Sequence, residues 1–222
     1  RPPLAFSDMQ FSFGITLLGQ SVEFVQQLIT CVDALQSIGL GKYRQAFKIQ
    51  TVSEVNLLNG ERRLLIDGQG QPINSMIGMV TWDDIQHTAD KLKGDSLNIT
   101  FLTQTTIIDN RKVLSTPNFR PFLQRLLERL LNIDMYYHNR TATIDIKNTL
   151  DLAGKITCSA NLTHFHGKKR SNRYSRNIVG YKGHAEYTGD FELILPVLIV
   201  GQLINVGKNT TKGCGWFQVA LH

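Results

Sequence analysis

Apolar and polar positions repeat with two distinct periods in the second half of the chain. From Leu97 to Ile107 every second residue is apolar or β-branched, which predicts a half-buried strand over Leu97–Ile108. From Phe119 to Tyr137 the apolar residues recur every three to four positions and form one stripe, opposite a polar face. That pattern predicts an amphipathic helix, with Thr116 as its N-cap and Pro117 in its first turn.

Four more elements follow with the same alternation of periods. The sequence predicts two strands, a helix and a last strand, over Ile156–His166, Ile178–Tyr187, Phe191–Ile204 and Trp216–Leu221. Together with the elements before them they give the order βαββαβ. This order is typical of the ferredoxin-like unit, a four-stranded antiparallel sheet with two helices on one face.

The first half carries only the later part of such a unit. We expect a strand over Met9–Leu17, a helix over Ser21–Ile38 that ends at Gly39, and a strand over Ala46–Val55. A hairpin that turns at Asp67–Gly70 and a connecting helix over Trp82–Lys93 follow.

The predicted fold class is therefore α+β, with tandem ferredoxin-like (RRM-like) domains that have antiparallel sheets. Residues 1–93 would form the first domain and its linker, and residues 94–222 the second domain with its Gly-rich loop. The first domain lacks its opening strand and helix, which we expect upstream of Arg1. Because the chain begins with Arg1 and not Met, we take it as a piece of a longer protein.

Charge points to an anionic partner. The 222 residues hold 24 Lys and Arg against 18 Asp and Glu, which gives a formal charge of +6 and a pI of about 9.3. Such an excess favours nucleic acid or an acidic surface. Three widely spaced cysteines fit neither a disulfide framework nor a CxxC zinc site, so a reducing cytoplasm fits best. No signal peptide is visible, and the apolar stretch Phe191–Ile204 is too short to span a bilayer.

The tail Asn205–Trp216 is rich in glycine, lysine and threonine. Glycines allow positive φ and a close approach of the backbone, and consecutive N–H groups beside lysines suit a phosphate. The candidate contacts are Lys208, Thr210, Thr211 and Lys212. A smaller loop of the same kind, Gly39–Arg44, offers Lys42 and Arg44. A plain turn between helix and strand remains the alternative for both loops.

A cationic cluster lies between the two middle strands of the second half. Five cations, a tyrosine and small polar residues fall within nine positions, where a hairpin tip would project. Guanidinium and hydroxyl groups contact phosphates, and tyrosine stacks on an unpaired base. RNA is thus the favoured ligand, and a solvated charged face is the alternative. The candidate RNA contacts are Lys168, Lys169, Arg170, Ser171, Asn172, Arg173 and Arg176.

Four motifs carry a family resemblance. They are Ser171-Asn-Arg173, the Gly-containing run from Ile178 to Asp190, Leu195-Pro-Val-Leu-Ile-Val-Gly-Gln-Leu203 and Val206-Gly-Lys-Asn-Thr-Thr-Lys-Gly-Cys-Gly215. With them the chain resembles the C-terminal part of the CRISPR repeat-processing endoribonuclease, a member of the RAMP superfamily. The terminal Gly-rich motif marks the whole superfamily, and the Ser-Asn-Arg and Gly-Asp segments narrow the resemblance to the processing nuclease.

The resemblance implies a function and its partners. It implies a prokaryotic, cytoplasmic protein that binds CRISPR repeat RNA, alone, with other CRISPR-associated proteins or within a fusion. It also implies cleavage without metal or cofactor, in which the neighbouring 2′-OH attacks phosphorus and leaves 2′,3′-cyclic phosphate and 5′-OH ends. Two alternatives stay open: a non-catalytic RAMP subunit that binds guide RNA in an effector complex, and a general RNA-binding module.

The chain departs from the family's pattern at the position where a catalytic base would be expected. Many family members have His before Val-Gly-Lys, where this chain has Asn205, and an amide is no proton shuttle near neutral pH. His166 and His184 flank the cationic cluster and are the candidates for proton transfer. A structural role is the alternative for each, and a base upstream of Arg1 is another. His164 and His166 form a His-x-His pair without further metal ligands in the sequence.

Overall fold

The computed structural model describes residues 10–66, 78–138, 145–170 and 175–221. Its contacts divide the chain into two compact units, Arg1–Ile49 and Gln50–His222, which are described separately below. This division falls earlier than residue 93, and the expected domain boundary there remains a prediction. Among the described residues, no helix is long and apolar enough to cross a membrane.

The first unit is built around one helix. A short 3₁₀ helix, η1 (Gly19–Phe24), leads into α1 (Val25–Ile38), close to the predicted helix. The helix ends where the sequence placed its stop, because Gly39 takes a φ of 81° and its N–H donates to the carbonyl of Leu35 at 2.8 Å. No residue of α1 is buried.

The predicted strand at Met9–Leu17 is wrong for the residues that the structure describes. Residues 10–18 have no regular structure, and Met9 lies outside the described part. Phe11 and Phe13 alternate with polar residues, yet both side chains stay more than half exposed. A strand needs a hydrogen-bonded neighbour, and none pairs with these residues in the described part of the unit.

The second unit opens with a small antiparallel hairpin. β1 (Val52–Val55) pairs with β2 (Arg62–Ile66), so the chain turns between Asn56 and Glu61. The strand predicted from Ala46 is therefore shorter than expected, and the turn predicted at Asp67–Gly70 lies outside the described residues. α2 (Trp82–Lys91) follows, begun by a capping box between Thr81 and Asp84, and packs against α5.

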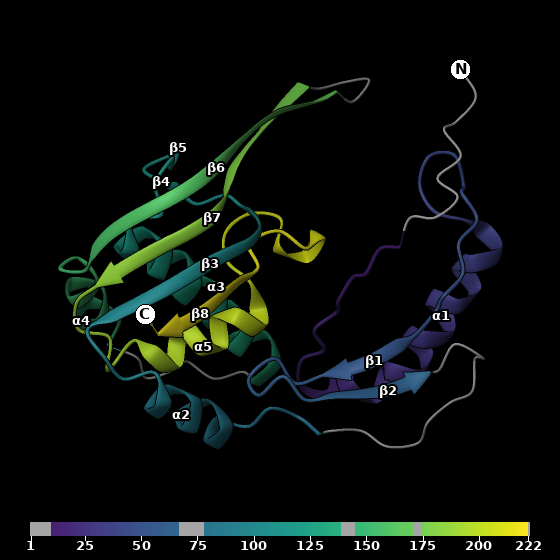
Figure 1. The fold of residues 1–222 in the computed structure, drawn as a ribbon, viewed down its shortest axis with the longest axis horizontal. Helices are drawn as coiled ribbons and strands as arrows, with labels where there is room; N and C mark the ends of the chain where they lie inside the picture. Colours follow the sequence, from purple (N-terminus) through teal and green to yellow (C-terminus); the bar gives the residue numbers. More distant parts are fainter. Residues whose placement is uncertain (1–9, 67–77, 139–144, 171–174, 222) are drawn as a thin grey trace. The chain divides into compact units, whose positions relative to one another are not determined.

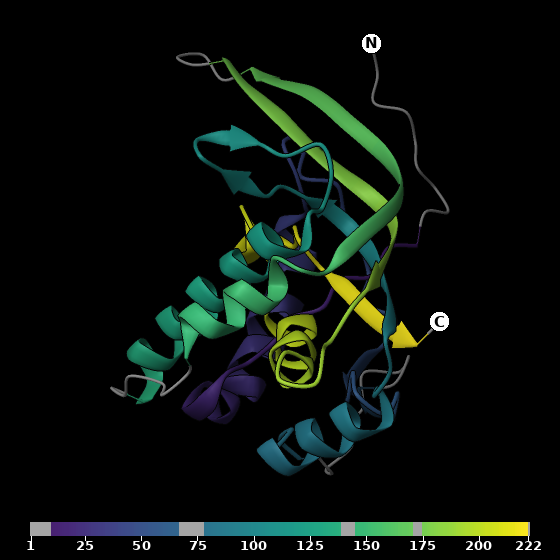
Figure 2. The same ribbon diagram turned by 90° about the vertical axis from the view of Figure 1, so that its left-hand side faces the viewer.

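A four-stranded antiparallel sheet forms the body of the unit (Figure 1). Its strands lie in the order β6-β7-β3-β8, with bounds Thr157–Arg170, Ser175–Thr188, Ser96–Thr105 and Phe217–Leu221. The two helices between them, α3 (Phe119–His138) and α5 (Leu195–Ile204), cover one face (Figure 2). The predicted α+β fold and the βαββαβ order are thereby confirmed.

Two smaller elements were not predicted. The hairpin of β4 (Ile108–Asp109) and β5 (Lys112–Val113) precedes α3, and α4 (Ile146–Ala153) packs against α3. The helix α3 itself begins two residues after Pro117, where the Asn118 carbonyl accepts from the N–H of Phe122.

Aromatic side chains fill the space between the sheet and the helices. The ring of Phe101 on β3 lies 5.8 Å from Phe122 on α3 and 5.2 Å from Tyr181 on β7, in edge-to-face contacts. All three are at most 1% exposed. Tyr187 is also buried, and its hydroxyl donates to the Pro117 carbonyl at 2.7 Å. This core holds the ends of β3, α3 and α5 in place, and the candidate site is built there.

Candidate nucleic-acid interface

Strands β6 and β7 run past the rest of the sheet as a two-stranded ribbon (Figure 1). β7 pairs with β3 only over residues 181–188, whereas it pairs with β6 as far as Arg170 and Ser175. At the far end Lys168 lies opposite Asn177 and Lys169 opposite Arg176. The ladder thus brings Lys168, Lys169, Arg170 and Arg176 to the end of the ribbon. Ser171, Asn172 and Arg173 lie outside the described residues.

The Gly-rich tail forms a closed loop between α5 and β8. Its two ends pair, because the N–H of Val206 donates to the Gly215 carbonyl at 2.9 Å. The N–H of Gly215 donates to the carbonyl of Gln104 on β3 at 3.0 Å, which ties the loop to the sheet. Two glycines are required by contact as well as by positive φ. A Cβ on Gly215 would clash with the Val206 carbonyl oxygen, and one on Gly207 would clash with that of Thr106.

The middle of this loop presents its polar residues to solvent. Asn209, with a φ of 60°, begins the short 3₁₀ helix η2 (Thr210–Lys212). Lys208, Thr211 and Lys212 are exposed, and Thr210 is half-buried. The backbone N–H of Lys208 donates to Thr106 at 3.1 Å, which fixes that lysine beside the end of β3. The loop is therefore a braced turn whose cations face outward, and its predicted contact with phosphate remains a prediction.

An open pocket adjoins this loop. It lies between Lys208, the C-terminal half of α3 and the β4–β5 hairpin. Four of its lining residues are cations and one is a carboxylate, so the described wall is positively charged. The lining consists of Thr106, Ile108, Arg111, Arg125, Glu128, Arg129, Asn132, Ile133, Tyr136, Tyr137, Gly207 and Lys208.

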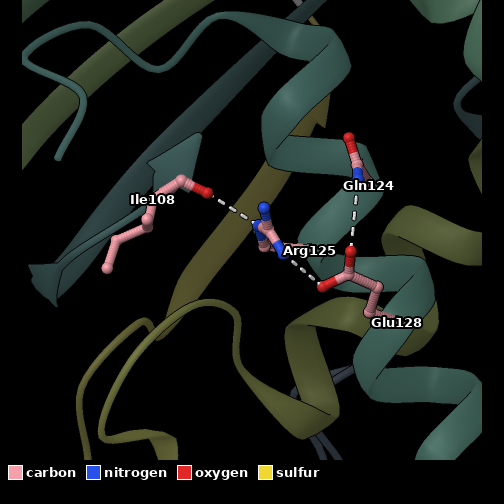
Figure 3. Close-up of polar contacts among 4 residues, drawn as sticks. All are labelled: Ile108, Gln124, Arg125 and Glu128. Carbon is pink, nitrogen blue, oxygen red and sulfur yellow. Dashed lines mark hydrogen bonds and ion pairs between the residues drawn. The ribbon is translucent and has the colours of Figure 1, made fainter. Parts of the chain in front are cut away.

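Two arginines of the pocket are held by hydrogen bonds to backbone carbonyls. Arg125 donates from Nε to the Ile108 carbonyl at 2.7 Å and from Nη1 to Glu128 Oε2 at 2.6 Å (Figure 3). Arg129 donates from Nε to the carbonyl of Ile204 at 2.6 Å. Partial burial lowers the pKa of Arg129, and arginine nonetheless stays charged at neutral pH. Both guanidinium groups are thus fixed, charged parts of the wall.

Sequence reasoning missed this pocket. The polar face predicted for the helix over Phe119–Tyr137 includes Arg125 and Arg129, but nothing in the sequence connected them with Lys208. The signal was their spacing, since Arg125, Arg129 and Tyr136 lie at i, i+4 and i+11 and share one helix face. Arg111, which completes the wall from the β4–β5 turn, had no signal in the pattern.

The register of β6 and β7 separates the two candidate histidines. His166 pairs with Val179, and His184 lies five residues farther along β7. Because side chains alternate between faces, an odd separation puts His166 and His184 on opposite faces of the ribbon, about 17 Å apart along the strand. Both are exposed, and the structure does not bring them to one reacting phosphate.

His184 lies on the sheet face opposite the helices. Its Nδ1 is 2.9 Å from the Thr100 hydroxyl on β3, in a cross-strand row that also holds Asn161 and Gln218. His164 and His166 share the other face of the ribbon, and both are exposed. Within the described residues, no three His, Cys, Asp or Glu side chains lie close enough to share a metal ion.

The loop Gly39–Arg44 of the first unit is a tight turn. Gln45 and Leu40 form an antiparallel bridge across it, and Arg44 takes a φ of 47°. The Nζ of Lys42 lies 5.4 Å from the centre of the Tyr43 ring, and both Lys42 and Arg44 are exposed. The predicted phosphate contacts of this loop remain predictions.

One solved structure of similar fold supports this architecture, and two others match less well. A Cas6 product complex matches with a TM-score of 0.53 at 16% sequence identity, over 89% of this chain and 72% of that one. Thermus thermophilus Cas6 matches with a TM-score of 0.47 at 15% identity, over 72% of this chain and 66% of that one. A partial Cas6-RT-Cas1–Cas2 complex matches with a TM-score of 0.48 at 15% identity, over 72% of this chain and 29% of that one. At such identities a likeness bears on the fold and not on function, and only the first match has a TM-score above 0.5.

Sequence comparison gives the family. No curated protein matches the chain. A family model described as an N-terminal domain matches residues 5–76. The model of the CRISPR-associated endoribonuclease Cas6 matches residues 99–217, more than half of the chain, and this span contains most of β3, all of α3 and α5 and the whole Gly-rich loop. The chain belongs to the CRISPR-associated endoribonuclease Cas6 family.

Proposed function

We propose that this chain binds CRISPR repeat RNA and cleaves it within the repeat to make guide RNAs. The observation that carries the proposal is the family match over residues 99–217, which spans both the ribbon and the Gly-rich loop. The RNA substrate is made in the cytoplasm of a prokaryote, and the proposal places the chain there. Other CRISPR-associated proteins, or a domain fused to the chain, are its proposed partners.

Two cationic surfaces of the second unit support RNA binding. The end of the β6–β7 ribbon carries Lys168, Lys169, Arg170 and Arg176, and a narrow ribbon of this kind fits against a nucleic-acid backbone. The Gly-rich loop adds Lys208, Thr210, Thr211 and Lys212. Ser171, Asn172 and Arg173, with Lys42 and Arg44 of the first unit, complete the proposed set of contacts.

The proposed reaction uses the RNA's own nucleophile. The 2′-OH next to the scissile phosphate loses its proton and attacks phosphorus, and the bond from phosphorus to the 5′ oxygen breaks. The products are a 2′,3′-cyclic phosphate and a 5′-OH, with no metal required if side chains move the protons and stabilise the phosphorane. His184 or His166, acting singly, or a base upstream of Arg1 would accept the proton. Lys208 would stabilise charge on the phosphate or hold a neighbouring one.

A non-catalytic RAMP subunit that binds guide RNA is the second candidate. Asn205 favours it, because the residue before Val-Gly-Lys holds no titratable group. Asn205 takes a φ of 62° and a ψ of 170° as the C-cap of α5, outside the left-handed helical region and strained for any residue other than glycine. A general RNA-binding module is the third candidate.

Cleavage in EDTA separates these candidates. The full-length protein is incubated with end-labelled repeat RNA and excess EDTA, beside a control RNA with a 2′-deoxy sugar at the mapped cleavage site. The proposal expects one cut in the first RNA, none in the second, and a cyclic phosphate end. Binding of the repeat without a cut favours the non-catalytic subunit, and equal affinity for unrelated RNAs favours the general module.

A further inference from the structure

Apart from Lys208, the pocket between α3, the β4–β5 hairpin and the Gly-rich loop has features that the proposed cleavage reaction does not use. Its wall combines four cations with two exposed tyrosines, Tyr136 at 80% and Tyr137 at 52% exposure. Within the described residues, Tyr136 buries little of its surface and Tyr137 only about half. A tyrosine beside fixed cations is instead the arrangement that binds an unpaired base and its phosphate.

Two cations of this wall, and the backbone of a third, are held in place before any ligand arrives. Nε of Arg125 and Nε of Arg129 each bond a backbone carbonyl, and the backbone of Lys208 is tied to Thr106. Glu128 neutralises part of Arg125 through its 2.6 Å contact. The excess positive charge therefore rests with Arg111, Arg129 and Lys208, which stand on three different segments around one opening.

The backbone at Arg111 supports a binding role. Asn110 and Arg111 form the two-residue turn between β4 and β5, with φ values of 46° and 64°. This is the conformation of a type I′ turn, for which Asn-Gly is the preferred pair. Arginine thus occupies the position where glycine would be least strained. Residues held in such conformations cluster at functional sites, and here the side chain lines the pocket.

We propose that this pocket binds an unpaired nucleotide of RNA, with a phosphate on Arg111, Arg129 and Lys208 and the base stacked on Tyr136. The proposal rests on the proposed function in taking RNA as the ligand, and it adds a subsite for single-stranded RNA on the helix side of the Gly-rich loop. The β6–β7 ribbon and the pocket would then bind different parts of one RNA.

Two variants test the subsite without unfolding the protein. Arg111→Gly removes a cation and gives the turn its preferred residue, so thermal stability is expected to stay level or rise. Tyr136→Ala removes a side chain that is mostly solvent-exposed. Lys91→Ala and Trp82→Ala on α2 are the matched controls, since Lys91 is exposed and Trp82 is 59% exposed, and neither lines the pocket.

Binding is measured with two RNA probes, an eight-nucleotide oligoadenylate and a blunt-ended RNA hairpin. Tyr136→Ala should weaken binding of the oligoadenylate about tenfold, as expected for one stacked base, and leave hairpin binding within about twofold. Arg111→Gly should also weaken oligoadenylate binding and make its log–log salt slope shallower by about 0.7. The two controls should bind both probes like the unmodified chain.

The subsite is overturned if both variants bind the oligoadenylate with the same affinity as the unmodified chain. Equal weakening toward the hairpin overturns it too, because the effect would then not be specific for unpaired RNA. Failure of the proposed function looks different: no cut in repeat RNA by the unmodified chain, while the loss of oligoadenylate binding in both variants still establishes the subsite.

Discussion

Nε of Arg129, on α3, donates a 2.6 Å hydrogen bond to the carbonyl of Ile204, the last residue of α5. The bond supplies a partner to one of the carbonyls that the end of a helix leaves free, and places a positive charge at the negative end of the helix dipole. Since Asn205 and the Gly-rich loop follow directly, it also fixes the point from which that loop departs.

Arg129→Ala should lower the free energy of unfolding by about 1–2 kcal/mol. A hydrogen bond from a charged donor sets this scale, reduced here because the side chain is only partly buried. Urea denaturation measures it, with Arg120→Ala as the control. Arg120 is an exposed arginine on the same helix, and its loss is expected to cost less than about 0.5 kcal/mol. Equal midpoints for the two variants would show that the bond to Ile204 contributes nothing.

Gly215 and Gly213 offer a matched pair in the same loop. Both have positive φ, 78° and 80°, but a Cβ on Gly215 meets the Val206 carbonyl whereas one on Gly213 has no atom within 4 Å. Gly213→Ala should therefore cost about 1–2 kcal/mol, the strain of left-handed backbone alone. Gly215→Ala should cost clearly more, because it must also separate the two paired ends of the loop.

Urea denaturation followed by circular dichroism compares these two variants. Gly213→Asn is the control, because asparagine tolerates this conformation and should recover most of the loss. If Gly213→Ala and Gly215→Ala cost the same, the close contact with Val206 is not what requires glycine in this loop.

The elements that the sequence predicted well are those whose apolar face meets the common core. β3, α3, β7, α5 and β8 each place buried side chains against the Phe101–Phe122 cluster, so their period is dictated by burial. The strand expected at residues 9–17 fails for the opposite reason. Its alternation is present, but no neighbour in the described part supplies hydrogen bonds. The short helix α4 escaped because eight residues give little periodic signal.

The candidate site likewise has parts that the sequence predicted and parts that it did not. Glycines and clustered cations marked the Gly-rich loop and the β6–β7 ribbon, since each lies within one continuous stretch of sequence. The pocket is lined by Arg111, Arg125 and Lys208, which lie far apart in the chain. They meet only because the β4–β5 hairpin, α3 and the Gly-rich loop converge. The separation of His166 from His184 likewise depends on the register between β6 and β7, which a single sequence does not specify.

Removing three cations should flatten the salt dependence of RNA binding. The triple alanine variant of Arg170, Arg173 and Lys208 is expected to bind repeat RNA more weakly. It should also reduce the slope of log Kobs against log salt by about 2, because each lost contact with a single-stranded phosphate takes about 0.7 from the slope. The control changes Lys91, Lys147 and Lys155 to alanine, three exposed lysines that remove the same total charge. If the first variant binds as tightly as the unmodified chain, the proposed RNA path is wrong.

The Cys158 thiol should react slowly with alkylating reagents. Burial raises the pKa of Cys158, and a hydrogen bond with Tyr187 lowers it to a lesser degree. A raised thiol pKa leaves less thiolate, the reactive form, at pH 8, and the rate should climb as pH rises toward that pKa. Iodoacetamide labelling followed by mass spectrometry should therefore modify exposed Cys31 well before Cys158. In urea, where the sheet is unfolded, the two rates should converge, and a difference that persisted there would contradict burial as its cause.

His166 and His184 should act independently if either contributes to cleavage. They lie on opposite faces of the ribbon, and sites farther apart than about 10 Å with no shared partner usually have additive effects. In single-turnover cleavage of repeat RNA, the loss in log rate of His166→Gln plus His184→Gln should equal that of the double variant. A cooperating acid and base would instead give a double variant scarcely slower than the worse single one.

Thr100→Val serves as the companion to His184→Gln, because it removes the hydroxyl 2.9 Å from Nδ1 and leaves the imidazole. If Thr100→Val lowers the cleavage rate as much as His184→Gln does, the contact between Thr100 and His184 acts by orienting this face of the sheet. A rate loss confined to His184→Gln instead assigns the effect to the imidazole itself.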